Sequence, residues 1–222
     1  MNFSDVLAMF NKKLTGSFNA PEKVMPENLK DVQIVGKLCA FTGYRPQKLP
    51  FTGEEDEKCI FLKNELRREI IKAMEDGYKN FMTGMALGVD TWAAEIVIDI
   101  KNLYEPWNEN IRLFAAVPFL DQPFKWQEWQ KERYNDILEY CDKILVISNE
   151  YTPECMNKRN RFMVDRADML IAVYDGKAGG TANTINMAKS KNMHIRIINP
   201  GKLQGYLSEN ESEEASFQTT LT

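Results

Sequence analysis

The sequence predicts an α/β protein of Rossmann-like type, with an open, mainly parallel sheet of about six strands and helices on both faces. Two observations carry this prediction. Short apolar runs alternate along the chain with longer segments whose apolar residues recur at helical spacing. Several of these runs are apolar throughout, as strands buried on both faces of a parallel sheet should be. Such alternation is typical of βαβ units, in which consecutive strands run parallel.

The individual elements follow from this pattern in chain order. The expected strands are the apolar runs 38–41, 81–83, 111–117, 144–147, 169–174 and 194–198. The two clearest helices follow the first two runs, because their apolar residues recur in steps that place them on one helical face. Those residues are Leu62, Leu66, Ile70 and Met74 in the first helix, and Val89, Ala93, Val97 and Ile100 in the second. Further helical patterns lie near residues 126–140, 156–167 and 181–191.

Composition divides the chain into three parts. Residues 1–36 are expected to form an N-terminal extension and linker, with a weak helical pattern at 5–14. Residues 37–204 carry the alternating pattern and are expected to form the folded, ligand-binding domain. Residues 205–222 are rich in glutamate and serine and lack a core pattern, so we expect an acidic, flexible tail there.

Charge and hydropathy restrict the partners and the location. The 28 lysines and arginines are outnumbered by 32 aspartates and glutamates, so the formal net charge is −4. Nucleic-acid-binding surfaces usually carry a basic excess, and this balance argues against nucleic acid as a partner. No apolar run approaches the roughly 18 residues of a membrane-spanning helix, and no basic-then-apolar leader opens the chain. We therefore expect a cytoplasmic protein that does not contact a membrane.

The residues available for chemistry exclude several familiar mechanisms. The four cysteines lie far apart and form no CxxC pair, so we expect no metal site. The single histidine, His194, begins the last expected strand, where a structural role is the simpler interpretation. A Ser-His-Asp triad or a multi-histidine metal centre would need this histidine. The residue types therefore identify no catalytic residue.

Glycine-containing segments follow three of the expected strands. In open α/β sheets ligands bind beyond the carboxyl ends of the strands, so these segments are candidates for a binding site. Glycine lets a backbone approach a ligand closely, and a helix N-terminus offers free N–H groups to an anion. Ordinary turns are the alternative for each segment taken alone. The segments are Thr42-Gly43-Tyr44-Arg45-Pro46, Thr83-Gly84-Met85-Ala86-Leu87-Gly88-Val89-Asp90 and Asp175-Gly176-Lys177-Ala178-Gly179-Gly180-Thr181.

The basic segment Lys158-Arg159-Asn160-Arg161 opens the helix before the fifth run. Two guanidiniums and an amide suit a phosphate or a carboxylate, although a solvated basic helix start is an equal alternative. A helix N-terminus normally prefers acidic residues, and this exception favours a binding role. Asp165 and Asp168 follow, and they either pair with these arginines or contact a ribose.

Four aromatic residues follow the third expected strand: Phe119, Phe124, Trp126 and Trp129. Three roles are open for them, namely a lid, a base-stacking wall, or packing in the core or at an interface. The first two roles would bring the rings to a ligand, and the third would not.

Five motifs, taken in order, resemble the SLOG superfamily and, within it, the YpsA-like group (DUF1273). The resemblance covers about residues 37–200. The first motif, Phe41-Thr42-Gly43-Tyr44-Arg45-Pro46, looks like the start of that group. Three motifs are similar to segments of the DNA-processing protein DprA: the segment from Thr83 to Asp90, Arg159-Asn160-Arg161, and Asn199-Pro200-Gly201. The fifth, Gly179-Gly180-Thr181 with Thr184, resembles the superfamily's phosphate loop. One such match would mean little, whereas five in this order make the assignment specific.

The resemblance implies a Rossmann-like fold that binds nucleotides or nucleotide derivatives. Some members sense NAD-derived or ADP-ribose-like signals, LOG-type members cleave the N-glycosidic bond of nucleoside monophosphates, and DprA binds single-stranded DNA. The LOG-type loop contains a catalytic glutamate, and Thr184 occupies that position here. The resemblance therefore favours a binding protein over an enzyme.

Our first hypothesis is a protein that senses or sequesters a nucleotide-derived small molecule, such as an ADP-ribose-like or NAD-derived ligand, without a cofactor. An N-glycosidase acting on a nucleotide, with Asp90, Asp165 or Asp175 replacing the missing glutamate, is the first alternative. Single-stranded DNA binding of the DprA kind is the second, and a homo-oligomer is left open. The expected ligand-binding residues are Gly43, Arg45, Gly84, Gly88, Asp90, Asn160, Arg161, Gly179, Gly180, Thr181 and Thr184.

Overall fold

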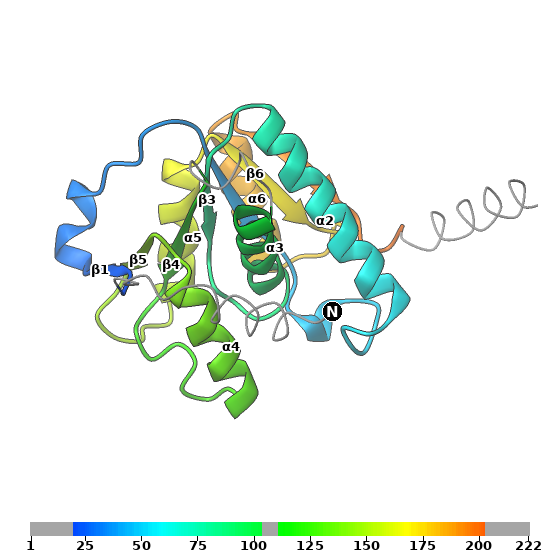
Figure 1. The fold of residues 1–222 in the computed structure, drawn as a ribbon, viewed down its shortest axis with the longest axis horizontal. Coiled ribbons are helices and arrows are strands. Elements are labelled where there is room, and N and C mark those ends of the chain that lie inside the picture. The colour runs from blue at the N-terminus through cyan, green and yellow to red at the C-terminus, as the bar shows by residue number, and fades with distance from the viewer. Residues whose placement is uncertain (1–19, 104–110, 203–222) are drawn as a thin grey trace, which may run out of the picture.

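Parallel pairing joins the strands of the structure into a single sheet. The computed structural model describes residues 20–103 and 111–202. Within these residues, seven strands lie in the order β1-β5-β4-β3-β2-β6-β7, and every neighbouring pair is parallel (Figure 1). The strands are β1 (Glu22–Val24), β2 (Leu38–Thr42), β3 (Asn80–Thr83), β4 (Arg112–Val117), β5 (Lys143–Val146), β6 (Met169–Val173) and β7 (His194–Ile198). The predicted α/β, Rossmann-like fold is confirmed, with a seventh strand added.

Helices cover both faces of this sheet. Residues of α2, α3 and α4 form a core with one face, and residues of α5, α6 and η1 form a core with the other. The helices are η1 (Pro26–Asp31), η2 (Pro46–Lys48), α2 (Glu57–Glu75), α3 (Val89–Leu103), α4 (Glu128–Glu139), α5 (Cys155–Arg166) and α6 (Gly180–Ser190). Among these helices, none is long and apolar enough to cross a membrane.

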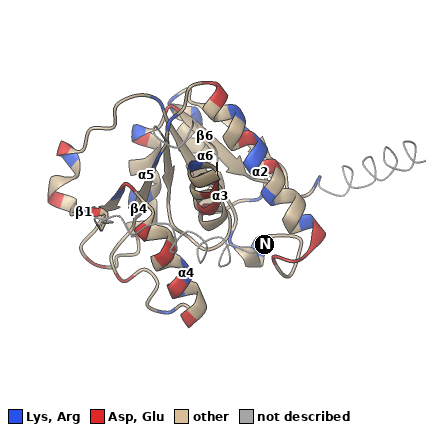
Figure 2. Ribbon diagram, in the orientation of Figure 1, with Lys and Arg blue, Asp and Glu red and all other residues tan. Residues whose placement is uncertain are grey.

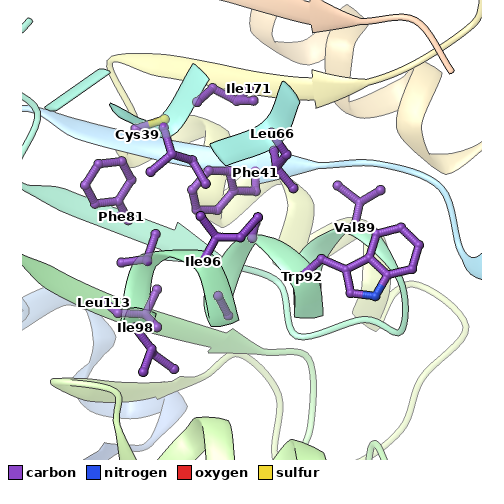
Figure 3. Packing of buried hydrophobic residues seen from close by; sticks show 14 of the residues in the cluster. Cys39, Phe41, Leu66, Phe81, Val89, Trp92, Ile96, Ile98, Leu113 and Ile171 are labelled. Carbon is purple, nitrogen blue, oxygen red and sulfur yellow. The ribbon is translucent and has the colours of Figure 1, made fainter. Parts of the chain in front are cut away.

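The larger of the two cores packs strands β2 and β3 against helix α3. Phe41 on β2 and Phe81 on β3 stack with ring centroids 5.9 Å apart, and Trp92 of α3 is buried beside Val89 at the start of its helix (Figure 3). Helix α3 lies between α2 and α4 and is buried on almost every side. Its buried residues include the carboxylates of Asp90 and Glu95, which pair with Arg159 and Arg133 respectively.

Strand β1 and helix η1 are elements that the sequence prediction missed, and β1 extends the sheet. Strand β1 lies within the segment interpreted as a linker, residues 1–36, and it pairs with β5 in the register Glu22 to Lys143. The Lys143 ammonium also bonds to the Glu22 carboxylate. Three residues are too few to show strand periodicity, so this edge strand has no sequence signal of its own. The expected helix at 5–14 and the expected tail at 205–222 lie outside the described residues.

The strand order reverses beside β2. From β2 the chain proceeds outward through β3, β4 and β5 on one side, and β6 and β7 lie on the other. The loops that leave β2 and β6 therefore diverge from adjacent strands and open a crevice at the carboxyl edge. The fold thus places the predicted segments after β2 and β6 side by side.

An ion-pair cluster holds the connection between β2 and α2 against the neighbouring helices. The Glu54 carboxylate accepts from Arg133 Nη1 of α4 at 2.6 Å and from the Lys63 ammonium of α2. Arg133 Nη2 also donates to Glu95 of α3, at 2.7 Å. Burial raises the pKa of Glu54, but hydrogen bonds and charge from Arg133 outweigh it and hold that pKa at about 2. The cluster therefore holds the α2 end of this connection in place, and Arg45 lies at its β2 end.

The turn into α3 requires glycine at position 88. Gly88 has a φ of +93°, and a Cβ there would lie 2.6 Å from the Tyr44 carbonyl oxygen. Gly77 has a similar φ of +87° but no neighbouring atom within 4 Å of such a Cβ. The two glycines share backbone strain and differ in the space around them.

We expect Gly88→Ala to destabilise the fold more than Gly77→Ala. Both substitutions place a Cβ in the left-handed region, at a cost of about 1–2 kcal/mol. The alanine at position 88 must also displace the loop after β2, and overpacking of this kind costs about 1–3 kcal/mol more. Urea unfolding of both variants measures the difference. Equal losses of stability would show that the loop after β2 shifts to make room for the alanine side chain without a further cost.

Candidate functional site

The carboxyl edge of the sheet contains a cavity of about 290 Å³ between the loop after β2 and the start of α6, the helix that follows β6. Its walls come from the β2 loop, the start of α3, one side of α5 and the first turns of α6. Seven of the predicted ligand-binding residues line it: Gly43, Arg45, Asp90, Asn160, Gly180, Thr181 and Thr184. The others, Gly84, Gly88, Arg161 and Gly179, do not appear in its lining.

Arg159 is the central side chain of the cavity wall. It is buried, its Nη1 donates to the Gly84 carbonyl oxygen, and the same nitrogen lies 3.5 Å from Asp90 Oδ2. The Asp90 carboxylate also accepts from the Ala86 N–H at 3.3 Å. Burial raises the pKa of Asp90, and the charge of Arg159 opposes that rise. The pair joins α5 to the loop between β3 and α3.

Gly84 and Gly88 shape this loop and do not line the cavity. A Cβ on Gly84 would lie 2.6 Å from Asp90 Oδ2 and would collide with the Arg159 guanidinium. The missing side chain therefore makes room for the buried ion pair. This is a packing role, whereas the sequence suggested contact with a ligand.

Arg161 points to a different part of the surface from Arg159. Residues two apart on an α-helix lie about 200° around its axis, so only one of these arginines can face the sheet. Arg159 shares the buried face with Cys155 and Met163, at steps of four, and Arg161 is exposed. That four-residue step was the available sequence signal for Arg159.

The first turn of α6 presents backbone groups to the cavity. Gly179 caps the helix with a φ of +146°, and a Cβ on Gly180 would meet nothing within 4 Å. The hydroxyl groups are already used: Thr181 donates to the Gly43 carbonyl oxygen at 3.0 Å, and Thr184 donates to the Gly180 carbonyl oxygen at 2.9 Å. The free donors here are therefore the N–H groups at the helix start.

Two exposed cations line the cavity, and one of them lies close to that helix start. Arg45 and Lys48 are exposed and line the cavity, and neither forms an ion pair within residues 20–103 and 111–202. A Cβ on Gly179 would lie 3.2 Å from Lys48 Nζ, so the ammonium sits against the N-terminal turn of α6. Cations are unfavourable at the positive end of a helix. A bound anion would offset this unfavourable contact between Lys48 and the helix start.

Tyr44 joins the two loops that frame the cavity. Its hydroxyl donates to Asp175 Oδ1 of the loop after β6, and Lys177 pairs with the same carboxylate at 2.6 Å. Hydrogen bonds from Lys177 and Tyr44 lower the pKa of Asp175 to about 2. Burial and this hydrogen bond both raise the pKa of Tyr44. The contact keeps the β2 and β6 loops together beside the cavity.

The carboxylates proposed as alternatives to the missing glutamate are dispersed. Asp90 lines the cavity, whereas Asp175 is held by Tyr44 and Lys177 outside the lining. Asp165 pairs with Lys191 at 3.1 Å. Among the described residues, Asp90 is therefore the one carboxylate in the lining.

The aromatic residues after β4 do not contribute to the cavity lining. Trp126 packs edge-on against Tyr134, with ring centroids 5.4 Å apart, and so extends the core. Phe124 and Trp129 are exposed. A base-stacking wall for this cavity is therefore not formed by these rings.

Solved structures share this architecture at low sequence identity. DprA from Streptococcus pneumoniae matches with a TM-score of 0.50 and 14% identity over 78% of this chain, which spans about half of that protein, 52%. DprA from Helicobacter pylori, whose structure is described as showing a unique single-stranded DNA binding mode, matches with a TM-score of 0.50 and 15% identity. That match covers 80% of this chain and 81% of the other.

These matches correct one expectation. We inferred from the net charge of −4 that nucleic acid is not a partner. That inference is wrong, because the same fold occurs in a protein described as binding single-stranded DNA. Net charge averages the whole surface and does not report a local basic site such as the pair Arg45 and Lys48.

Sequence relatives cover most of the chain. A UPF0398 protein of Halalkalibacterium halodurans is 29% identical over 186 residues, covering 81% of this chain and 96% of the relative. A UPF0398 protein of Bacillus thuringiensis is 32% identical over 186 residues, covering 81% and 99%. A model of the YspA SLOG family matches residues 39–203. The predicted YpsA-like SLOG assignment is confirmed, and the chain belongs to the YspA SLOG family.

Proposed function

We propose that this protein binds a nucleotide, with a phosphate group held between Arg45, Lys48 and the first turn of α6. The observation that carries the proposal is one cavity lined by two cations without an ion pair and by a helix N-terminus, with Lys48 against that helix start. Exposed cations and free helix N-termini are each common in proteins. Placing positive side chains beside the positive end of a helix is unfavourable, and a bound anion would offset that repulsion.

The remaining walls suit the other parts of a nucleotide. Met156, Met163 and Leu170 supply an apolar wall for a base. Asn160 accepts from Arg159 Nε at 2.9 Å through Oδ1, so its amide N–H groups are free to donate to a ligand. A volume of about 290 Å³ lies at the lower end for small-molecule sites and suits one nucleotide unit. An ADP-ribose-like or NAD-derived ligand would extend beyond the mouth.

Single-stranded DNA is the second candidate ligand. The observation that favours it is the fold shared with DprA, one example of which is described as binding single-stranded DNA. One nucleotide of a strand presents the same phosphate and base as a free nucleotide. The two candidates differ in what lies beyond the cavity mouth, and both require the anion site.

We expect nucleotides to raise the melting temperature of the protein. Ligand binding to the native state stabilises it by about 2.7 kcal/mol at about a hundredfold excess over Kd. The panel is AMP, ADP-ribose, NAD and a short oligothymidylate, with adenosine as the phosphate-free control, measured by differential scanning fluorimetry. Gly180→Val is the matched variant, because the valine enters the cavity without meeting the surrounding fold. No shift with any phosphate-bearing ligand, or an equal shift with adenosine, contradicts the proposal.

Arg45→Ala should weaken nucleotide binding, whereas Arg161→Ala should not. Hydrogen bonds to charged groups contribute about 1.5–3 kcal/mol, so loss of Arg45 should raise Kd by roughly 10- to 150-fold. Arg161 is also an exposed arginine but does not line the cavity, which makes it the matched control. Isothermal titration calorimetry gives both affinities. Equal losses for the two variants would place the phosphate on a diffuse basic surface.

We expect no N-glycosidic cleavage at a LOG-like rate. Cleavage develops positive charge on the sugar, which a carboxylate stabilises, and the neutral Thr184 hydroxyl is already bonded to Gly180. Asp90 is paired with Arg159 and is the one carboxylate of the described residues in the lining. Release of free base from AMP, measured by chromatography against Gly180→Val, tests this. Turnover that the variant abolishes would make the protein an enzyme, and Asp90→Asn would then test its acid.

A further inference from the structure

Large apolar side chains are exposed on the segments that follow the neighbouring strands β4 and β5, including the first turn of α4. The exposed fractions are 44% for Leu120, 76% for Phe124, 53% for Trp129 and 65% for Tyr151. We call these four residues the aromatic surface. Phe119 connects its two loops, because its ring meets Tyr151 edge-on with centroids 5.5 Å apart. Scattered apolar residues are normal on a protein, whereas a gathered set marks an interaction site.

The loop that carries Leu120 and Phe124 is anchored in this exposed position. Gln122 is buried, and its Nε2 donates to the Met85 carbonyl oxygen at 2.8 Å. The Trp129 indole donates to Gln127 Oε1 at 2.6 Å, which orients the ring on the first turn of α4. A surface fixed in advance loses little conformational entropy when a partner docks.

Acidic residues surround the aromatic surface. On α4, Glu132 and Asp136 follow Trp129 at steps of three and four, so they share its outer face, while Tyr134 and Ile137 face the core. Figure 2 shows acidic positions along this helix. The exposed acids are Asp121, Glu128, Glu132, Asp136, Glu150 and Glu154. The nearby cations Lys125, Lys131 and Lys158 are fewer, and Lys131 pairs with Glu128 at 3.2 Å.

We propose that the aromatic surface and its acidic rim form a docking site for a basic segment of a partner protein, one that places apolar side chains on the rings and lysines or arginines against the rim. Interfaces concentrate aromatic residues at their centre and charged residues around them. Opposite charge on the partner then guides encounter and selects the partner. The acids repel the phosphates of a nucleic acid or an anionic membrane, so a basic polypeptide is the occupant that this charge pattern accepts.

This site is separate from the cavity but connected to its wall. Gln122 reaches Met85 in the β3–α3 loop, and the Ala86 N–H of that loop bonds to Asp90 at 3.3 Å. None of the four residues of the aromatic surface lines the cavity. The proposal therefore stands or fails independently of nucleotide binding.

The test measures binding of a fluorescent peptide in which lysines alternate with leucine and tryptophan, compared with the same peptide carrying glutamate in place of lysine. We expect the lysine peptide to bind the full chain and the glutamate peptide not to bind. The double variants F124S/Y151S and E132Q/D136N should each weaken binding at least tenfold, about 1.4 kcal/mol. Ile197→Ser is the matched control, because Ile197 is 51% exposed on β7 at the opposite edge of the sheet.

Several results would overturn the proposal. They are equal binding of both peptides, unchanged affinity in the two double variants, or an equal loss with Ile197→Ser. Sedimentation adds another arm: a dimer that F124S/Y151S converts to a monomer would make a second copy the occupant. Oligothymidylate binding that is lost in F124S/Y151S would make nucleic acid the occupant. All substituted side chains are exposed, and unchanged melting temperatures confirm that each variant is folded.

Discussion

The buried guanidinium of Arg159 is the contact on which the geometry of the cavity depends. It reaches from α5 across the sheet edge to the Gly84 carbonyl oxygen and the Asp90 carboxylate. Removing a charge from water is costly unless it is paired and hydrogen-bonded, so the β3–α3 loop must remain where both acceptors meet it. Gly84 follows from this requirement, because any side chain there would occupy the space of the ion pair.

The regular elements were predictable because their signal is local. The apolar face of α3 and the apolar runs of the central strands are properties of adjacent residues, and they match the observed helix and strands. The partners of Arg159 lie 75 and 69 residues away along the chain, and no local pattern connects them. The segments after β2 and β6 were expected to share one edge of the sheet, and they do. The carboxyl ends of parallel strands lie at the same edge in any such sheet, so this expectation needed no knowledge of distant contacts.

The net charge of the chain does not show where its charged residues lie on the surface. The acids that make the net charge negative include those of α4 and of the Arg133 cluster. Lys48 instead lies against the start of α6, and Arg45 lines the same cavity. Acidic and basic side chains therefore gather at different places on the same protein. The net charge sums all of these residues, whereas the fold determines where each of them lies.

Strand β1 has a consequence for how the protein can be divided. The family match begins at residue 39, so it omits β1, which covers the open side of β5. Without that cover, the apolar Ile144, Leu145 and Val146 would form a bare sheet edge. Bare edges pair with other chains and lead to aggregation. The opposite edge strand carries Arg196, held by Asp76 and Glu69, and is protected by charge. Three residues that the sequence pattern places in a linker thus protect one edge of the sheet from pairing with another chain.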